Sequence, residues 1–212
     1  MAHASGTTMS VALGDLAKVE AGFPFRGKVD PVDGGEVVIL QQRDLTGLAS
    51  SPADEGAWRV PDTAVRASMQ AGFKRHLLDT DAVLLQARGG QFLAAAFQGG
   101  FTAVAAHGLA VIRIRDAEAL QPAYLSWWLN HPRTNRLLNS LSGGTHIPFI
   151  SNRAIRELQL PLPAPVEQDR IVEADHVRRM HRALMQKLIK TNDQLVDAVT
   201  WRAANGQTRK DS

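Results

Sequence analysis

The sequence SGGTHIPFISNRAIRELQLPLPAPVEQDRIV, residues 142–172, decides the fold because it separates a domain-like region from a helix-like region. Gly143-Gly144 favours the interior of neither a helix nor a strand. We therefore expect Leu141 to end a helix and Thr145-His146 to lie on an exposed loop. A short helix over residues 152–156 should follow this loop.

The next residues predict a strand and then the start of a second helix. Leu158, Leu160 and Leu162 alternate with polar residues and prolines, which is strand periodicity that must stop at an edge. Pro165 suits the first turn of a helix, and Glu167 places a negative charge where the helix dipole favours one. The sequence therefore predicts a new helix from Pro165.

This helix can continue for about 40 residues, because no Pro or Gly interrupts the chain before Gly206. Apolar residues recur at spacings of three and four, so the helix needs a partner along one face. The residues expected to make this pairing are Val177, Leu184, Leu188 and Leu195. Arginines and lysines over residues 178–190, where there is no acidic residue, indicate either a solvated face, which we favour, or a site for phosphates or an acidic partner.

Upstream of residue 142, the pattern is mostly that of strands. Apolar runs at 36–40, 82–85, 92–97, 101–104 and 109–114 are separated by glycine-containing turns. Two helices should follow, the first opened by Pro122 and the second over residues 134–141. The aromatic residues of the first have helical spacing, which favours core packing over base stacking.

Polar residues that follow the predicted strands are candidates for nucleic-acid contacts. Gln and Arg side chains can read adenine and guanine bidentately, although a solvated turn would have the same composition as residues 41–43. Arg88 ends a strand beside two glycines, which let a backbone approach a ligand closely. A phosphate or base contact at Arg88 is favoured over an ion pair mainly by the family resemblance given below. Phe23 and Phe25 are better read as core residues than as contacts. The complete set of candidates is Arg26, Lys28, Gln41, Gln42, Arg43, Arg88, Gly89, Gly90, Thr145 and His146.

Composition bounds the class of protein. The chain has 212 residues, of which 44% are hydrophobic, so it can bury a core. Its apolar runs are too short to cross a bilayer, and the lack of cysteine fits a reducing cytoplasm. The net charge of +3 comes from residues 151–212, because acidic and basic residues balance over residues 1–150. The net charge does not decide whether the domain binds DNA.

Several catalytic signatures are missing from the sequence. It has no Asn/Asp-Pro-Pro-Tyr/Phe motif of adenine methyltransferases, no Glu-x-Lys nuclease pattern, no HExxH metal motif and no GxxxxGK phosphate loop. We therefore predict no catalytic residue, no metal site and no cofactor.

The order of three motifs resembles that of the DNA-specificity subunits of type I restriction-modification systems. These motifs are LGDLAKVEAGFPFRGK at residues 13–28, DTDAVLLQARGG at 79–90 and the quoted stretch from Gly143. The second has Thr80 where the family usually has Gly. The resemblance implies an α+β fold, in which a strand-rich target recognition domain with short helices precedes a long coiled-coil-type helix. It also implies a half-length form with one such domain and one such helix.

The expected domains follow from these patterns and from the resemblance. Residues 1–10 should be a disordered leader, 11–163 the recognition domain, 164–204 the long helix and 205–212 a flexible tail.

The resemblance implies a non-catalytic, cytoplasmic subunit of a phage-defence system. Its expected partners are double-stranded DNA, a modification methyltransferase and a second copy of the chain, paired through the helix. A restriction or translocase subunit stays open as a further partner. So does a second, different specificity chain in place of the second copy. Two alternatives remain, namely an inhibitor or assembly protein that binds the methyltransferase without reading DNA, and an enzyme of unknown type.

Overall fold

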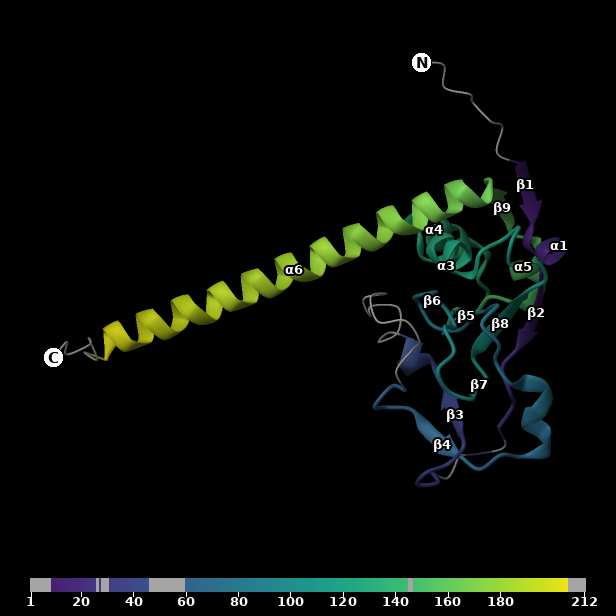
Figure 1. Ribbon diagram of the computed structural model, residues 1–212, viewed down its shortest axis with the longest axis horizontal. Coiled ribbons are helices and arrows are strands. Elements are labelled where there is room, and N and C mark those ends of the chain that lie inside the picture. Colours follow the sequence, from purple (N-terminus) through teal and green to yellow (C-terminus); the bar gives the residue numbers. More distant parts are fainter. Residues whose placement is uncertain (1–8, 26, 28–30, 46–59, 145–146, 206–212) are drawn as a thin grey trace, which may run out of the picture. The chain divides into compact units, whose positions relative to one another are not determined.

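The computed structural model describes residues 9–25, 27, 31–45, 60–144 and 147–205. The chain forms two compact units, Met1–Val172 and Glu173–Ser212. The elements are β1 (Met9–Ala12), α1 (Leu13–Leu16), β2 (Ala17–Ala21), β3 (Val37–Leu40), β4 (Val65–Ala67), η2 (Ala71–His76), β5 (Ala82–Gln86), β6 (Ala94–Ala96), β7 (Ala103–Ala105), β8 (Leu109–Ile114), α3 (Pro122–Asn130), α4 (Pro132–Leu141), α5 (Asn152–Glu157), β9 (Gln159–Leu162) and α6 (Pro165–Ala204). Figure 1 labels the strands and the α-helices. This confirms the predicted α+β fold with a long C-terminal helix.

The strands form three sheets. Strands β2, β8, β5 and β6 make an antiparallel sheet in that order. Strands β4, β3 and β7 make a second sheet, which is mixed. In the second sheet β3 is antiparallel to β4 but parallel to β7, with Val38 opposite Ala103. Strands β1 and β9 pair alone. A parallel pair requires a long connection, and the connection between β3 and β7 contains β4, η2, β5 and β6.

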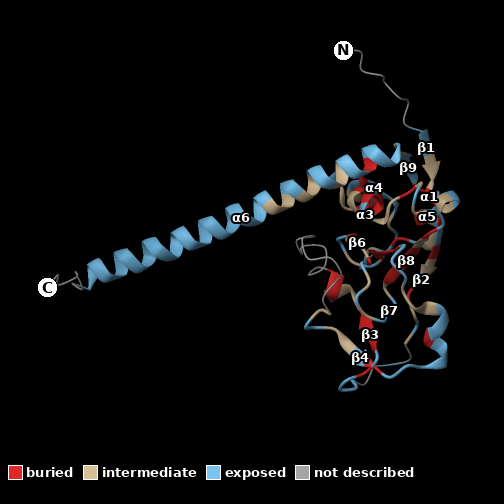
Figure 2. Ribbon diagram, in the orientation of Figure 1, coloured by how far each residue is buried: buried red, intermediate tan, exposed pale blue. Residues whose placement is uncertain are grey.

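The two larger sheets pack face to face, which explains their continuous apolar runs. In β5, Leu84 faces the second sheet while Val83 and Leu85 face the helices. In β3, Val38 and Leu40 face the first sheet, whereas the intervening residues face the cluster around Phe73. Since side chains alternate along a strand, a strand covered on both faces is apolar at every position. Figure 2 shows the resulting buried residues in the strands.

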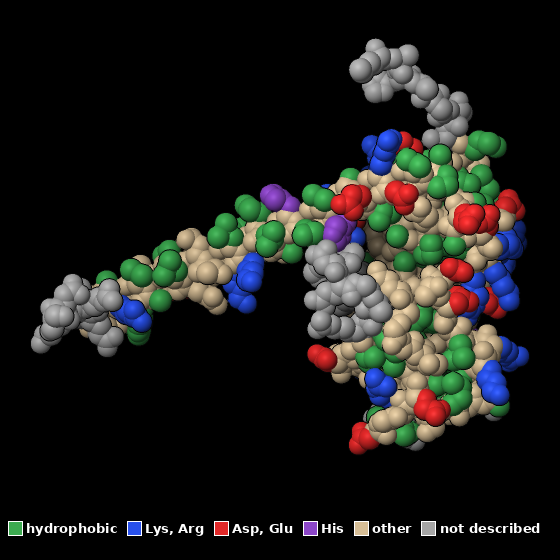
Figure 3. Space-filling view, in the orientation of Figure 1, with side chains coloured by type: hydrophobic (Ala, Val, Ile, Leu, Met, Phe, Trp, Pro, Cys, Tyr) green, Lys and Arg blue, Asp and Glu red, His purple; other side chains and the backbone are tan. Residues whose placement is uncertain are grey.

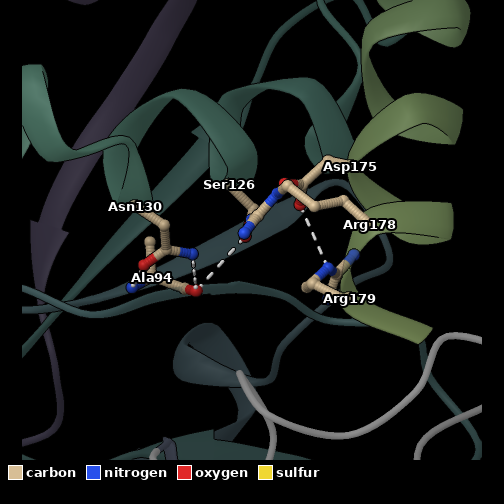
Figure 4. Close-up of polar contacts among 6 residues, drawn as sticks. All are labelled: Ala94, Ser126, Asn130, Asp175, Arg178 and Arg179. Carbon is tan, nitrogen blue, oxygen red and sulfur yellow. Dashed lines mark hydrogen bonds and ion pairs between the residues drawn. The ribbon is translucent and has the colours of Figure 1, made fainter. Parts of the chain in front are cut away.

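Helix α3 covers the outer face of the first sheet, and its aromatic residues are core residues, as predicted. Tyr124 and Trp128 are buried. The helix is tied to β6 by side-chain bonds, shown in Figure 4, in which the carbonyl of Ala94 accepts from Ser126 Oγ at 3.2 Å and Asn130 Nδ2 at 2.7 Å. Helix α4 begins at Pro132, earlier than residue 134, because proline occupies a position where a helix needs no N–H donor.

The segment that follows the double glycine forms the predicted elements. Ser151 caps helix α5, its Oγ accepting the N–H of Ala154 at 3.1 Å, and β9 then pairs with β1. Strand β1 begins at Met9, inside the stretch expected to be a leader, because residues 9 and 10 lie opposite Leu162 and Pro161.

The start of α6 belongs to the first unit and is anchored there by Gln168. This side chain is fully buried, its Oε1 accepts the N–H of Gln121 at 2.9 Å, and its Nε2 donates to the carbonyls of Ala119 and Pro163 at 2.8 and 3.0 Å. The Oε1 atom and the Nε2 group of Gln168 therefore both have hydrogen-bond partners, as burial requires.

The second unit contains the rest of α6. Asp175 forms ion pairs with Arg178 and Arg179, drawn in Figure 4, so part of the basic stretch is compensated within its own helix. Among the described residues, no helix is both long and apolar enough to span a membrane.

Candidate nucleic-acid interface

The loop after β5 presents Arg88 at the protein surface. Arg88 is exposed, and within the described ranges its guanidinium group has no hydrogen-bond or ion-pair partner. Gly89 follows with a φ of +102°, a backbone conformation that residues other than glycine rarely adopt. The backbone after Arg88 thus requires glycine, and the cation itself is exposed to solvent.

The loop between α4 and α5 lies beside the Arg88 loop. Gly143 and Phe149 exchange two backbone hydrogen bonds of 2.9 Å, which closes a short hairpin. Gly89 N–H donates to the carbonyl of Pro148 at 2.9 Å, and Ile150 N–H donates to that of Ala87 at 3.0 Å. The structure therefore brings together two motifs that lie more than 50 residues apart in the sequence.

Thr145 and His146 lie outside the described residues, between the two described sides of this hairpin. At Gly144 a Cβ atom would be 2.6 Å from the carbonyl oxygen of Ile147, so the turn requires glycine. The predicted contacts at positions 145 and 146 stay predictions.

The turn of His107 and Gly108, between β7 and β8, is the meeting point of the other candidate segments. The carbonyl of Gly108 accepts the N–H of Ala87 at 3.0 Å, and the N–H of His107 donates to the carbonyl of Phe23 at 3.0 Å. At Gly22, a Cβ atom would be 2.2 Å from the carbonyl oxygen of Ala106. The first motif therefore packs directly against the turn that supports Arg88.

Two of the candidates in the first motif, Arg26 and Lys28, lie outside the described residues. The aromatic residues beside them, Phe23 and Phe25, are partly buried and pack against the core cluster that contains Phe73. Phe23 lies edge to face with Phe25 and Phe73, with ring centroids 4.8 and 5.0 Å apart.

The polar segment after β3 folds around a buried carboxylate. Asp44 Oδ2 accepts the N–H of Gln41 at 2.7 Å, and Oδ1 accepts the hydroxyl of Thr63 at 2.5 Å. Arg43 donates to the carbonyl of Thr63 at 3.0 Å, and Gln42 donates to the carbonyls of Arg88 and Gly108. Residues 42–45 are therefore helical and are bonded through their side chains to distant loops of the domain, although Arg43 is exposed.

Three exposed side chains at this cluster of loops were not singled out from the sequence. His107 is exposed at the supporting turn, and Ile147 and Phe149 are 62% and 42% exposed on the hairpin. Apolar groups of this kind can contact thymine methyl groups. The spacing of Ile147, Phe149 and the buried Ile150 gives no clear alternation, so only the hairpin pairing distinguishes which of them are exposed.

The described residues contain no group of three or more His, Cys, Asp and Glu side chains placed to hold a metal ion. The chemistry offered by the loops is therefore that of hydrogen bonding and charge, centred on the guanidinium of Arg88, together with apolar contact.

Comparison with protein families gives one match that covers most of the chain. Residues 6–189 match the model described as type I restriction modification DNA specificity domain. A search of curated proteins finds no match.

Solved structures share the fold over nearly the whole chain. The S subunit of a type I restriction-modification system from M. genitalium aligns with a TM-score of 0.56 and 14% identity over 95% of this chain and 47% of its own. The HsdS subunit from Thermoanaerobacter tengcongensis aligns with a TM-score of 0.54 and 18% identity over 86% and 41%. A chain from a study of assembly and conformational transition of the type I R-M system gives 0.58 and 19% over 93% and 46%. The present chain thus spans about half the length of each.

Proposed function

Since the chain belongs to the type I restriction modification DNA specificity domain family, we propose that it reads a target sequence in double-stranded DNA on behalf of a separate modification methyltransferase. In this role the chain selects the site and carries no catalytic residue of its own. The complex would act in phage defence in the cytoplasm, and a restriction or translocase subunit stays open as a further partner.

The observation that carries this proposal is the convergence of loops on the exposed cation of Arg88. The Arg88 loop is bonded to the hairpin of residues 143–149 on one side and to the turn of residues 107–108 on the other. Arginine can donate two parallel hydrogen bonds to guanine or to a phosphate, and both acceptors occur at a DNA groove. A loop that is bonded on both sides and carries an exposed guanidinium group is suited to this task.

The other candidate contacts are kept as part of the proposal, except Gln42, whose amide donates to the carbonyls of Arg88 and Gly108. Gly89 and Gly90 would let the backbone approach DNA, and among the described residues beyond its chain neighbours none comes within 4 Å of the position of a Cβ at Gly90. Arg26, Lys28, Gln41, Arg43, Thr145 and His146 belong to the same or neighbouring segments. Phosphate contacts would fix the orientation of the domain, and base contacts would determine its specificity.

We also propose that the second unit pairs with a second copy of the chain through α6. Figure 3 shows hydrophobic side chains along much of this helix, and Leu184 and Leu188 are 63% and 62% exposed. Val177 and Leu195 are also exposed on the same face. Burial of apolar surface contributes about 25 cal/mol per Å², so a second helix would stabilise this face. Such a dimer would read two inverted copies of one short sequence.

Methylome sequencing tests the function directly. Cells that carry the chain and its neighbouring methyltransferase should contain a modified motif that disappears when the chain is deleted. An Arg88→Ala variant should lose or relax that motif, whereas Arg170→Ala, on the first turns of α6, should retain it.

The same cells distinguish the main alternative. An inhibitor or assembly protein would form a complex with the methyltransferase but would leave the modified motif unchanged and would not shift duplex DNA. This outcome would overturn the proposal, and methyl transfer by the purified chain alone would point instead to an enzyme.

A further inference from the structure

Two glutamine amides converge on one backbone carbonyl beneath Arg88. Gln42 Nε2 donates to the carbonyl of Arg88 at 3.1 Å, and Gln86 Nε2 donates to the same oxygen at 3.0 Å. A carbonyl oxygen has two lone pairs, so these two donors satisfy it completely. We refer to Gln42 and Gln86 as the amide pair.

Gln42 also binds the neighbouring turn. Its Nε2 donates to the carbonyl of Gly108 at 3.0 Å, and that oxygen accepts the N–H of Ala87 at 3.0 Å as well. One amide group therefore joins the segment of Gln42 to two loops that lie 46 and 66 residues further along the chain. Both partners are acceptors, which identifies the group that faces them as the NH2.

Two glycines provide the space that the amide pair occupies. A Cβ atom at Gly89 would be 3.0 Å from Gln86 Nε2, and a Cβ atom at Gly108 would be 3.0 Å from Gln42 Nε2. Both glycines have φ near +100°, at +102° and +100°. The positive φ values and the closeness of the amide pair thus both favour glycine at positions 89 and 108.

These bonds conflict with a direct reading of bases by Gln42. A glutamine that reads adenine donates an amide N–H to N7 and accepts from the N6 amino group. Both N–H groups of Gln42 already donate to protein carbonyls, which leaves only its Oε1. The side chain therefore has the chemistry of a support.

We propose that Gln42 and Gln86 are positioning residues that hold Arg88 in the orientation needed to discriminate one base pair. The inference rests on the proposed DNA recognition. Holding the carbonyl of Arg88 fixes the peptide plane from which its side chain extends. Ordering the loop before binding avoids an entropy cost on binding, and it preserves the directional bonds that distinguish bases.

A double-mutant cycle tests this inference in the complex with the methyltransferase. Gln42→Glu keeps the shape of the side chain but places a carboxylate, which can only accept, against two carbonyl oxygens. Binding would be measured for wild type, Gln42→Glu, Arg88→Ala and the double variant. The DNA would be the duplex with the methylated motif and its single-base variants.

The expected results are those of a residue, Gln42, that affects DNA binding only by positioning Arg88. Gln42→Glu should weaken binding about tenfold and relax discrimination at the same base position as Arg88→Ala, because it removes hydrogen bonds of ordinary strength. The double variant should bind as weakly as Arg88→Ala alone. Gln98→Glu adds the same charge in the loop that follows β6 and should bind as wild type does.

Other results would overturn the inference. Additive losses, or relaxation at a different base position, would show that Gln42 itself contacts DNA, and an unchanged affinity would show that the amide pair has no role. If Gln42→Glu fails to fold, the same cycle with Gln86→Glu decides, since Gln86 lies at the surface end of β5. Failure of the wild-type complex to bind any duplex would instead refute the proposed function.

Discussion

The side chain of Gln168 accepts a hydrogen bond of 2.9 Å from the backbone N–H of Gln121, and this bond ties the first turn of α6 to the start of α3. We expect Gln168→Ala to lower the free energy of unfolding by about 3 kcal/mol, because it leaves one buried N–H and two carbonyls without partners. Chemical denaturation of the chain measures this loss. Gln159→Ala, at an exposed residue with a single 3.3 Å bond, should change it by less than about 0.5 kcal/mol. Equal losses would contradict the anchoring role of Gln168.

The ionisation of Tyr124 should report on the integrity of the first unit. Burial raises the pKa of Tyr124 to about 12, and its hydroxyl donates to the carbonyl of Pro161 at 2.7 Å. Because the folded pKa lies above the unfolded value of about 10, the stability contributed by the neutral phenol is complete below pH ~10. It is lost as the pH rises from ~10 through ~12.

Absorbance of the phenolate measures this shift without ambiguity, since the chain has one tyrosine. The midpoint should lie near pH 12 in the folded chain and near pH ~10 in denaturant. Tyr124→Phe should abolish the signal. A midpoint near pH ~10 in a chain that is still folded would contradict the packing described for α3.

Substitution of Arg88 should distinguish a base contact from a phosphate contact. Arg88→Ala should cost about 1–3 kcal/mol of binding free energy and relax one base position if the guanidinium reads a base. Arg88→Lys retains the charge but loses the paired donors, so it should relax the same position with a smaller loss of affinity. Binding to single-base variants of the target measures both effects. Uniform weakening on every sequence, with a reduced salt dependence, would assign Arg88 to a phosphate.

Pairing of α6 is tested by charges placed on its apolar face. Leu184→Asp and Leu188→Asp should convert a dimer into a monomer, because each places a carboxylate in a helix interface, and sedimentation of the purified chain measures the change. Gln186→Asp adds the same charge on the opposite face of the helix and should leave the dimer intact. A wild-type chain that sediments as a folded monomer would contradict self-pairing and favour a second, different specificity chain.

The local elements could largely be predicted from the sequence, but the layering of the sheets could not. The run at 82–85 is apolar at every position, and this predicts a strand buried on both faces without naming the partner on either face. The parallel pairing of Val38 with Ala103 depends on packing between distant segments. Helices α3 and α6 were predictable because proline marks the start of each.

The candidate contacts show a similar limit. The loop at Arg88 follows from a strand that ends in Arg-Gly-Gly, and the structure places that cation at the surface. Gln42, by contrast, has a composition that suits base reading, while its actual hydrogen bonds go to the carbonyls of Arg88 and Gly108. No local pattern encodes partners 46 and 66 residues away, and the role of the side chain therefore required the fold.

The antiparallel pair of β1 and β9 brings the start and the end of the strand-rich part of the first unit side by side. Val11 lies opposite Leu160, so the chain enters and leaves the unit through adjacent strands. A unit with neighbouring entry and exit points can be excised and grafted between the same flanking segments without stretching either connection. Genetic exchange at these two points would replace the loops around Arg88 while leaving α6 unchanged.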